Sequence, residues 1–314
     1  MPGLSDTGLA ALQDSFSLAE ELSGSFECGA LGFDVVRVRV GDSVQTAHGL
    51  SVPSVDAGTI ATPNVVVVAA IGAKTPDALA NALLHDSVRT AGSLLRKWHG
   101  EGAIIAAACT GTFVVAEAGL LDGLTSTTSW WLGPYFRSRY PRVKLADEVM
   151  VYNAGTIVTA GAVLAHFDLA LWLIRQSSPI AAAQTARYLV TEARVSQAGY
   201  VIPDHLRHND PFVQRFEHWS RQNLAGGFSL RSAAKTVGTS PRTLSRKVQR
   251  VIGKSPLAYF QDVRVERAVH LLQTTNESVD EVAAMVGYSN RVTLCALLRR
   301  RLGRSVSEIR SFTR

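Results

Sequence analysis

The chain has few cysteines, and this scarcity excludes two classes of protein. Three cysteines occur among its 314 residues, Cys28, Cys109 and Cys295, and no pair of them has the Cys-x-x-Cys spacing. A disulfide framework needs paired cysteines, and a zinc cluster needs ligands only a few residues apart. We therefore expect a cytoplasmic protein, kept in a reducing compartment, that holds no disulfide scaffold, no metal and no cofactor.

Long apolar stretches are also missing. No apolar run approaches the roughly 18 residues of a membrane span. Residues 1–16 lack the basic region followed by an apolar block that marks a secretory signal. With 46% hydrophobic and 18% charged residues, the chain can still bury ordinary hydrophobic cores. These features predict a globular protein, long enough for two domains and without membrane contact.

Positive charge is scarce in the front of the chain and concentrated at its back. Residues 211–314 contain 18 Lys and Arg against 7 Asp and Glu, a net charge of +11, whereas residues 1–210 have a net charge of −5. A basic segment of this kind predicts contact with a polyanion such as DNA. A basic solvated surface would give the same count, so the local sequence pattern has to distinguish the two.

The first two thirds of the chain alternate strand-like and helical patterns. The strand-like segments are 33–40, 64–70, 103–108 and the hairpin 148–159. The helical segments are 76–98, 111–119, 161–175 and 180–190. This alternation predicts an α/β sandwich with a mainly parallel sheet. Because helical sequence begins within a few residues of Met1, either the sheet lacks an edge or central strand, or the natural chain begins earlier.

Between the two regions, residues 195–210 lose periodicity and gain Gly, Pro and polar residues, which predicts a linker. His205 and His208 lie in this segment. Two histidines without a nearby third ligand are more often surface residues than a metal site. We therefore predict a first domain at residues 1–194 and an all-α second domain at residues 211–314.

The basic third contains an internal repeat. Two segments run through Val-Gly-x-Ser into a new helix: AAKTVGTSPRTLSRKV (233–248) and VAAMVGYSNRVTLCALL (282–298). Gly238 and Gly287 would each end one helix, and Ser240 and Ser289 would cap the next. A helix, a short glycine-containing turn and a second helix form a helix-turn-helix. We predict two such units, joined by a long helix over residues 256–273.

The second helix of such a unit, the recognition helix, enters the major groove of DNA. In the first unit Leu244 and Val248 would face the core, and arginines on the opposite face could bond a guanine edge. In the second unit Val292, Cys295 and Ala296 offer little to a base edge. The residues predicted to contact DNA are Arg242, Thr243, Ser245, Arg246, Lys247, Arg291, Arg299 and Arg300. Two helical hairpins in a purely structural bundle are the alternative.

At these residues the C-terminal hundred residues resemble the AraC/XylS family of bacterial transcription regulators. Gly-Lys-Ser-Pro at 253–256 and Gly-Arg-Ser-Val at 303–306 follow the two recognition helices, where that family repeats Gly-x-Ser-Pro. The resemblance implies base contacts by Arg242, Ser245 and Arg246 in the first unit.

The resemblance also implies a base contact by Arg291 in the second unit, where this chain departs from the family. Leu294 and Leu298 replace aromatic residues, and Ala296 replaces a customary arginine. We therefore expect the first unit to read sequence and the second, with Arg299 and Arg300 at phosphates, to anchor the protein.

The stretch CTGTFVVAEAGLLDGLTSTTSWW (109–131) resembles the DJ-1/PfpI group, whose fold is flavodoxin-like and belongs with the class I glutamine amidotransferases. Fused ahead of two helix-turn-helix units, such a domain gives the architecture of GlxA-type AraC regulators. The resemblance implies a first domain that senses a small molecule and dimerises.

Cys109 has the position of a nucleophile elbow, but the histidines that would activate it are absent. Hydrolase members of the group have histidine directly after this cysteine, where Thr110 stands here, and relatives have Thr-Thr-His-Trp where this chain has Ser129 before Trp130. The family's carboxylate partner of the cysteine would be Asp14. His166 lies on an otherwise apolar helix and reads as a packed or capping residue.

We therefore expect no catalysis at this position. Thr110 and Gly111 begin the next helix, whose free N–H groups suit an anion, and Trp130 could contact a cation. The residues predicted to line a pocket for an effector are Cys109, Thr110, Gly111, Asp14 and Trp130. For the thiol itself, a buried small hydrophobe and a redox sensor are alternatives.

Together these features predict a homodimeric, sequence-specific transcription activator that binds promoter DNA and works with RNA polymerase. Its effector would be a small metabolite, and relatives of this architecture respond to amino-acid-derived and quaternary ammonium compounds. One alternative is an active cysteine amidase or glyoxalase-like hydrolase fused to a DNA-binding domain. Another is a scaffold whose first domain only dimerises.

Overall fold

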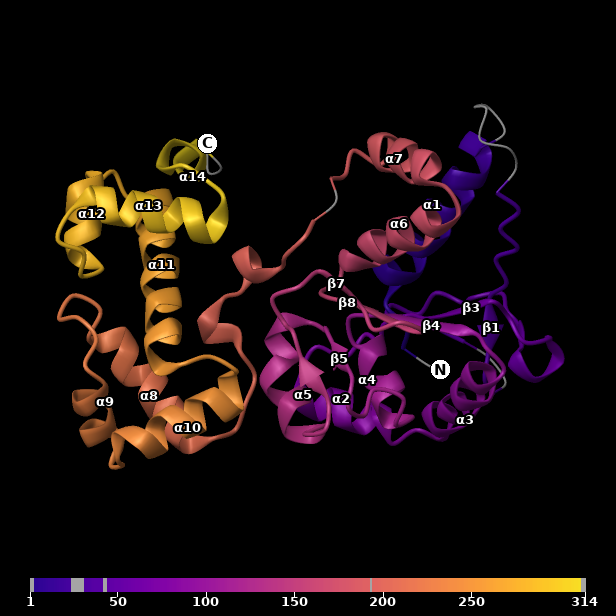
Figure 1. The fold of residues 1–314 in the computed structure, drawn as a ribbon, viewed down its shortest axis with the longest axis horizontal. Helices are drawn as coiled ribbons and strands as arrows, with labels where there is room; N and C mark the ends of the chain where they lie inside the picture. The colour runs from indigo at the N-terminus through magenta and orange to yellow at the C-terminus, as the bar shows by residue number, and fades with distance from the viewer. Residues whose placement is uncertain (1–2, 24–30, 42–43, 193, 312–314) are drawn as a thin grey trace. The chain divides into compact units, whose positions relative to one another are not determined.

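The computed structural model describes residues 3–23, 31–41, 44–192 and 194–311 (Figure 1). The chain divides into two units, Met1–Gln197 and Ala198–Arg314, and each unit has hydrophobic cores of its own. Cys28 lies outside the described residues. Among the helices that are described, none is both long enough and apolar enough to span a membrane.

A four-stranded sheet lies at the middle of the first unit. Its strand order is β3 (Val65–Val68), β4 (Ile104–Ala108), β8 (Ile157–Ala160) and β7 (Val151–Asn153). The first three strands are parallel, and β7 runs antiparallel to β8 in the predicted hairpin. On β4, Ile105 and Ala107 belong to one core while Ala106 and Ala108 belong to the other. A strand buried on both faces has this continuous apolar sequence, and the predicted α/β fold is confirmed.

Helices cover both faces of this sheet (Figure 1). The core on one face is formed with α1 (Asp6–Ser23), α6 (Ala165–Ser177) and α7 (Pro179–Tyr188). The core on the other face is formed with α2 (Pro76–Leu83), α3 (Asp86–Gly100), α4 (Gly111–Glu117) and α5 (Gly133–Arg139). Two short parallel pairs lie outside the sheet: β1 (Val38–Arg39) with β2 (Val55–Asp56), and β5 (Thr125–Ser126) with β6 (Lys144–Leu145).

Two predicted elements of the first unit are wrong in extent. The strand expected at 33–40 is reduced to β1, because the segment facing it contains Pro53, which has no N–H to donate. The helix expected at 76–98 is divided into α2 and α3. The division lies at His85, whose Nδ1 accepts a hydrogen bond from Ser87 N at 3.2 Å and so caps α3.

No strand precedes α1 in the described part of the chain. Leu4 instead forms isolated β-bridges with Thr46 and Ile71, and Ser5 N donates to Ala70 O at 2.8 Å. These single bridges hold the start of α1 beside the carboxyl end of β3.

The described part of the second unit consists of helices. After the short 3-10 turns Ala198–Tyr200 and Pro203–His205, they are α8 (Pro211–Gln222), α9 (Leu230–Val237), α10 (Pro241–Ile252), α11 (Pro256–Thr274), α12 (Val279–Met285), α13 (Arg291–Leu302) and α14 (Val306–Ser311). One core is built with α8, α9 and α10, and the other with α12, α13 and α14. The predicted long helix is confirmed as α11, and it belongs to both cores: Phe260 and Val263 to the first, Val265 and Ala268 to the second.

Arg264 lies on α11 between these two sets of core residues and is only 8% exposed. Its guanidinium donates to Leu224 O from Nε at 3.1 Å and from Nη2 at 2.6 Å. It also lies 4.7 Å from the ring centroid of Phe260 and 5.0 Å from that of Tyr288. Leu224 follows α8 and Tyr288 lies in the turn before α13, so one buried cation connects the two halves of the unit.

The predicted linker at 195–210 is packed against both units at its ends. Residues at its start belong to the first unit: Met150 N donates to Val195 O at 3.1 Å, and Gln197 N donates to Glu148 O at 2.9 Å. Near its end, the prediction that His208 is a surface residue is wrong. Its side chain is buried, with Nε2 3.0 Å from Oε1 of Glu217 on α8. The hydrogen bond between His208 and Glu217 allows both polar side chains to be buried, although the segment around His208 has no apolar periodicity.

The substitution Gly287→Ala should destabilise the second unit. Gly287 has a φ of +82°, and a Cβ there would overlap Arg264 Nη2 and Leu224 O. We expect a loss of about 3 kcal/mol or more in the free energy of unfolding, because the overlap displaces a buried hydrogen-bonded cation. Urea denaturation of the full-length protein measures this loss.

Gly303→Ala is the matched control. Gly303 also has a positive φ, +69°, but nothing lies within 4 Å of an added Cβ. Only the backbone conformation is penalised there, by about 1–2 kcal/mol. Equal losses in the two variants would show that Arg264 does not impose the requirement for glycine.

Candidate functional site

Each recognition helix begins at a capping side chain. Ser240 caps α10, and its Oγ accepts a hydrogen bond from Thr243 N at 3.2 Å. Asn290 caps α13, and its Oδ1 accepts from Thr293 N at 2.9 Å. The prediction that Ser289 caps the second helix is therefore wrong. Asn290 takes the extended backbone of a cap, and its amide oxygen serves there as well as a serine hydroxyl.

The caps determine which residues of the two units correspond. The turn glycines Gly238 and Gly287 are 49 residues apart, whereas the caps Ser240 and Asn290 are 50 apart, so the second turn is one residue longer. Both recognition helices have 12 residues and end at a left-handed glycine. The residues at corresponding core positions are buried in both: Leu244 and Leu294, Val248 and Leu298.

This correspondence changes the expected roles in the second unit. Arg291 corresponds to Pro241 and not to a base-contacting position of the first helix. Its guanidinium is exposed and lies 4.0 Å from the carboxylate of Asp280. The residues that correspond to Arg242 and Arg246 are Val292 and Ala296.

On the first recognition helix, Arg242 and Arg246 are exposed to solvent. Thr243 and Ser245 are partly buried, and Thr243 Oγ1 accepts a hydrogen bond from Ser240 Oγ at 3.0 Å. Lys247 differs from the prediction that it faces outward. Its ammonium lies 3.8 Å from the ring centroid of Phe212, so the Lys247 side chain packs within its own unit.

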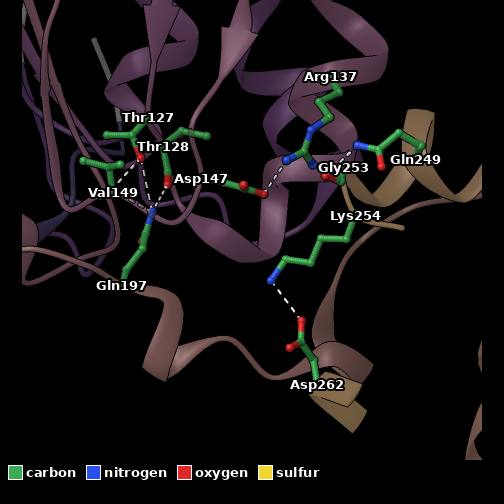
Figure 2. A network of polar contacts seen from close by, with 10 residues as sticks. All are labelled: Thr127, Thr128, Arg137, Asp147, Val149, Gln197, Gln249, Gly253, Lys254 and Asp262. Atoms are coloured by element: carbon green, nitrogen blue, oxygen red, sulfur yellow. Dashed lines mark hydrogen bonds and ion pairs between the residues drawn. The ribbon is translucent and has the colours of Figure 1, made fainter. Parts of the chain in front are cut away.

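On the second recognition helix, Arg299 and Arg300 are exposed in the last turn. Their neighbour Arg301 is bound to α11, since its Nη1 lies 3.3 Å from Asp262 Oδ1. The other oxygen of Asp262 lies 2.9 Å from Nζ of Lys254, which follows α10 (Figure 2). One largely buried carboxylate thus holds the C-terminal ends of both recognition helices. Sequence patterns missed this carboxylate because Arg301 is 39 residues from Asp262 in the chain.

Cys109 lies at the carboxyl end of β4, with a φ of +56° that is unusual for a residue other than glycine. Its N–H donates to Ala160 O at 3.0 Å, its side chain is 4% exposed, and Sγ lies 2.8 Å from Ser129 Oγ. Burial raises the pKa of the Cys109 thiol, although hydrogen bonds with Ser129 and Thr110 oppose this shift. The thiol is therefore protonated at neutral pH, and a protonated thiol is a poor nucleophile.

Buried hydroxyl groups surround this thiol and bond to the backbone. Thr110 Oγ1 donates to Ile71 O at 2.6 Å, Thr112 Oγ1 to Thr127 O at 3.2 Å, and Thr128 Oγ1 to Cys109 O at 2.7 Å. Gly111 packs so closely on β3 that a Cβ would overlap Val68 O. At the start of α4, where free N–H groups are predicted to suit an anion, Thr112 N donates to Cys109 O at 3.3 Å and Phe113 N donates to Thr110 O at 3.1 Å.

Gln197 extends this polar network to the last residue of the first unit (Figure 2). Its Nε2 donates to Thr128 O at 2.9 Å and to Thr127 Oγ1 at 3.2 Å, and its Oε1 accepts from Ala162 N at 3.1 Å. The side chain is buried. Sequence reasoning missed Gln197 because a single polar residue in a non-periodic segment gives no signal of burial.

The structure separates the remaining predicted site residues. Asp14 is exposed on α1 while its neighbours Leu12 and Ser15 are buried, and no hydrogen bond among the described residues joins it to Cys109. The expected carboxylate partner is therefore wrong. Trp130, by contrast, is buried beside Ser129, with its ring edge-to-face against Trp131 at 5.5 Å.

His166 is confirmed as a packed residue. It is fully buried, and Nδ1 lies 2.6 Å from Val163 O. Burial lowers the pKa of the imidazole, which is therefore neutral. Gly8 of α1 packs directly against this ring, where a Cβ would lie 2.6 Å from Nε2. His166 thus serves the contact between α1 and α6, not the cysteine.

Two family models match the chain in separate segments. The model of the DJ-1/PfpI family matches residues 12–176, and the model of a helix-turn-helix domain matches residues 233–311. The first segment contains the four-stranded sheet and Cys109, and the second contains both recognition helices.

Curated relatives match most of the chain. The HTH-type transcriptional regulator GbdR of Pseudomonas aeruginosa is 27% identical over 288 residues, which are 89% of this chain and 74% of the relative. The HTH-type transcriptional regulator GlxA of Rhizobium meliloti is 26% identical over 255 residues, 80% of this chain and 76% of the relative. Among solved structures, an AraC family transcriptional regulator from Pseudomonas putida aligns at 17% identity with a TM-score of 0.49, covering 60% of this chain and 95% of its own.

Native Cys109 should resist alkylation. Its raised pKa and its burial both lower the amount of accessible thiolate, the form that reacts. We expect iodoacetamide at pH 7.5 to label Cys109 at least roughly tenfold more slowly in the folded protein than in urea. Mass spectrometry of the Cys109 peptide measures both rates, and the half-exposed Cys295 in the same sample is the control. Equal rates for Cys109 in the folded and unfolded protein would contradict a protected thiol.

Proposed function

The chain belongs to the DJ-1/PfpI family and joins that domain to an AraC-type helix-turn-helix domain, and we propose that it activates transcription from promoter DNA in response to a small metabolite. The observation that carries DNA binding is the pair of equivalent recognition helices, each capped at its start and held at its end through Asp262. Two helices that are capped at their starts and bound through Asp262 at their ends, on a segment of net charge +11, suit adjacent major-groove contacts.

The first recognition helix supplies the base contacts in this proposal. Arg242 and Arg246 are exposed on the face opposite the buried Leu244 and Val248. An arginine in this position can donate two hydrogen bonds to the O6 and N7 of guanine. Arg299 and Arg300 suit phosphate contacts, which position the protein without reading sequence.

Binding of the full-length protein to its DNA site should weaken by roughly 100-fold or more between 50 and 200 mM salt, because several phosphates release counterions.

Arg246→Ala should weaken specific binding by about 1–3 kcal/mol and relax the preference at one base position. Fluorescence anisotropy on a site selected from random DNA measures both effects.

Arg267→Ala is the matched control, because Arg267 is exposed on α11 and its loss removes the same charge outside the recognition helices. Binding that ignored both salt and sequence would overturn the proposed function. An equal loss of specificity in the two variants would overturn the role given to Arg246.

For the first domain we propose a sensing role at the wall formed by Cys109, Ser129 and Trp130. The positive φ of Cys109 supports this proposal, since strained backbone persists where the surrounding structure holds it in place and is frequent at ligand sites. A small amine or quaternary ammonium compound would suit the indole of Trp130 through a cation–π contact. Entry of a ligand would require the Cys109–Ser129 contact to open.

A thermal-shift screen of nitrogen-containing metabolites tests this role. The proposal requires a compound that raises the melting temperature of the wild type but not of Cys109→Ala, and that changes DNA affinity. If no compound does so and DNA affinity is independent of metabolites, the first domain is a scaffold. Dimerisation, contact with RNA polymerase and a cytoplasmic location belong to the same proposal, and sedimentation of the free and DNA-bound protein tests the first of them.

A cysteine hydrolase remains the second candidate function because the elbow geometry of Cys109 is present. The raised pKa of the thiol and its serine partner favour the sensor instead. Turnover of glutamine, methylglyoxal or small amides that is abolished by Cys109→Ser would establish the hydrolase and overturn the inactive-domain proposal.

A further inference from the structure

We propose that the second recognition helix reads thymine through its methyl group, using Val292 and Ala296. This inference rests on the proposed function, since it assigns a base preference to a helix that function places on DNA. The first helix would select guanine and the second thymine.

The register of the two helices identifies these residues. Counting from the caps Ser240 and Asn290, Val292 takes the position of Arg242, and Ala296 takes that of Arg246. The two positions at which the first helix presents guanidinium groups are thus occupied by apolar side chains in the second. Neither valine nor alanine can donate a hydrogen bond to guanine or accept one from cytosine.

Val292 and Ala296 lie on the outward face of α13. They are four residues apart and therefore share one side of the helix. Val292 is 70% exposed, and Ala296 is also exposed, whereas Leu294 and Leu298 are fully buried in the second core. The fold of the unit thus makes little use of the Val292 side chain, which stands in the first turn, where recognition helices contact bases.

Thymine is the base that an apolar side chain can recognise in the major groove. Its C5 methyl group projects into the groove, and the other base edges present only hydrogen-bonding groups there. The exposed Arg299 and Arg300 in the last turn of α13 are available for phosphates. In this arrangement the apolar residues Val292 and Ala296 would contact thymine methyl groups in the major groove. The arginines at the end of the same helix would contact the phosphates beside that groove.

Replacing thymine by deoxyuridine tests this inference, because uracil lacks only the methyl group. A binding site is first selected from random DNA with the full-length protein, and each thymine is then replaced singly. We expect about a fourfold rise in Kd for each methyl group that contacts Val292 or Ala296. Replacement of thymines elsewhere in the site should leave Kd unchanged.

Val292→Ser adds the matching change on the protein. Because Val292 is exposed, the variant should fold as the wild type does, which its melting temperature verifies. It should bind the thymine site more weakly and lose the penalty for uracil at the paired position. Arg291→Ala is the control: it should weaken binding to all sites alike and keep the uracil penalty.

The outcomes separate this inference from the proposed function. If binding is specific but uracil is tolerated at every thymine of the selected site, the thymine contacts alone are overturned. A selected site that contains no thymine has the same consequence. The absence of any sequence-specific binding overturns the proposed function, and this inference with it.

Discussion

The DNA-binding unit depends on the placement of Arg264 between two cores. Each core contains one helix-turn-helix, α11 contributes residues to both cores, and Arg264 lies between its two sets of core residues. Its bonds to Leu224 O and its contact with Tyr288 tie the loop after α8 to the turn before α13. A buried cation without such partners would be severely destabilising, so the two halves are held in one arrangement. Asp262, two residues earlier on α11, joins the ends of both recognition helices through its contacts with Lys254 and Arg301.

Much of this fold could be predicted from the sequence, because hydrophobic periodicity and turn glycines report local structure directly. The apolar run at 103–108 and the helix after 256 are examples. One prediction that failed was the choice between two adjacent capping residues, Ser289 and Asn290. Both residue types cap helices well, so local chemistry did not decide between them. The shift of one residue places Val292, and not Arg291, at the position that corresponds to Arg242.

Around Cys109, too, the features that depend on neighbouring residues could be predicted from the sequence, and those that depend on distant contacts could not. The position of Cys109 after a strand and the missing histidines are visible in the sequence. The exposure of Asp14 is not, because the facing of a helical residue depends on which stripe of α1 is buried, and small residues such as Gly8 and Ser15 leave that stripe ambiguous. The Ser129 partner depends on a contact across 20 residues of chain, which no periodicity encodes.

Gln197 has a consequence for how the first domain can be cut from the chain. Two hydrogen bonds run in series from the elbow to this residue: Thr128 Oγ1 donates to Cys109 O, and Gln197 Nε2 donates to Thr128 O. A fragment that ended at residue 194, where regular sequence stops, would leave Thr128 O and Ala162 N without their partner. Expression of the isolated first domain must therefore extend through Gln197 to preserve the hydrogen bonds around Cys109.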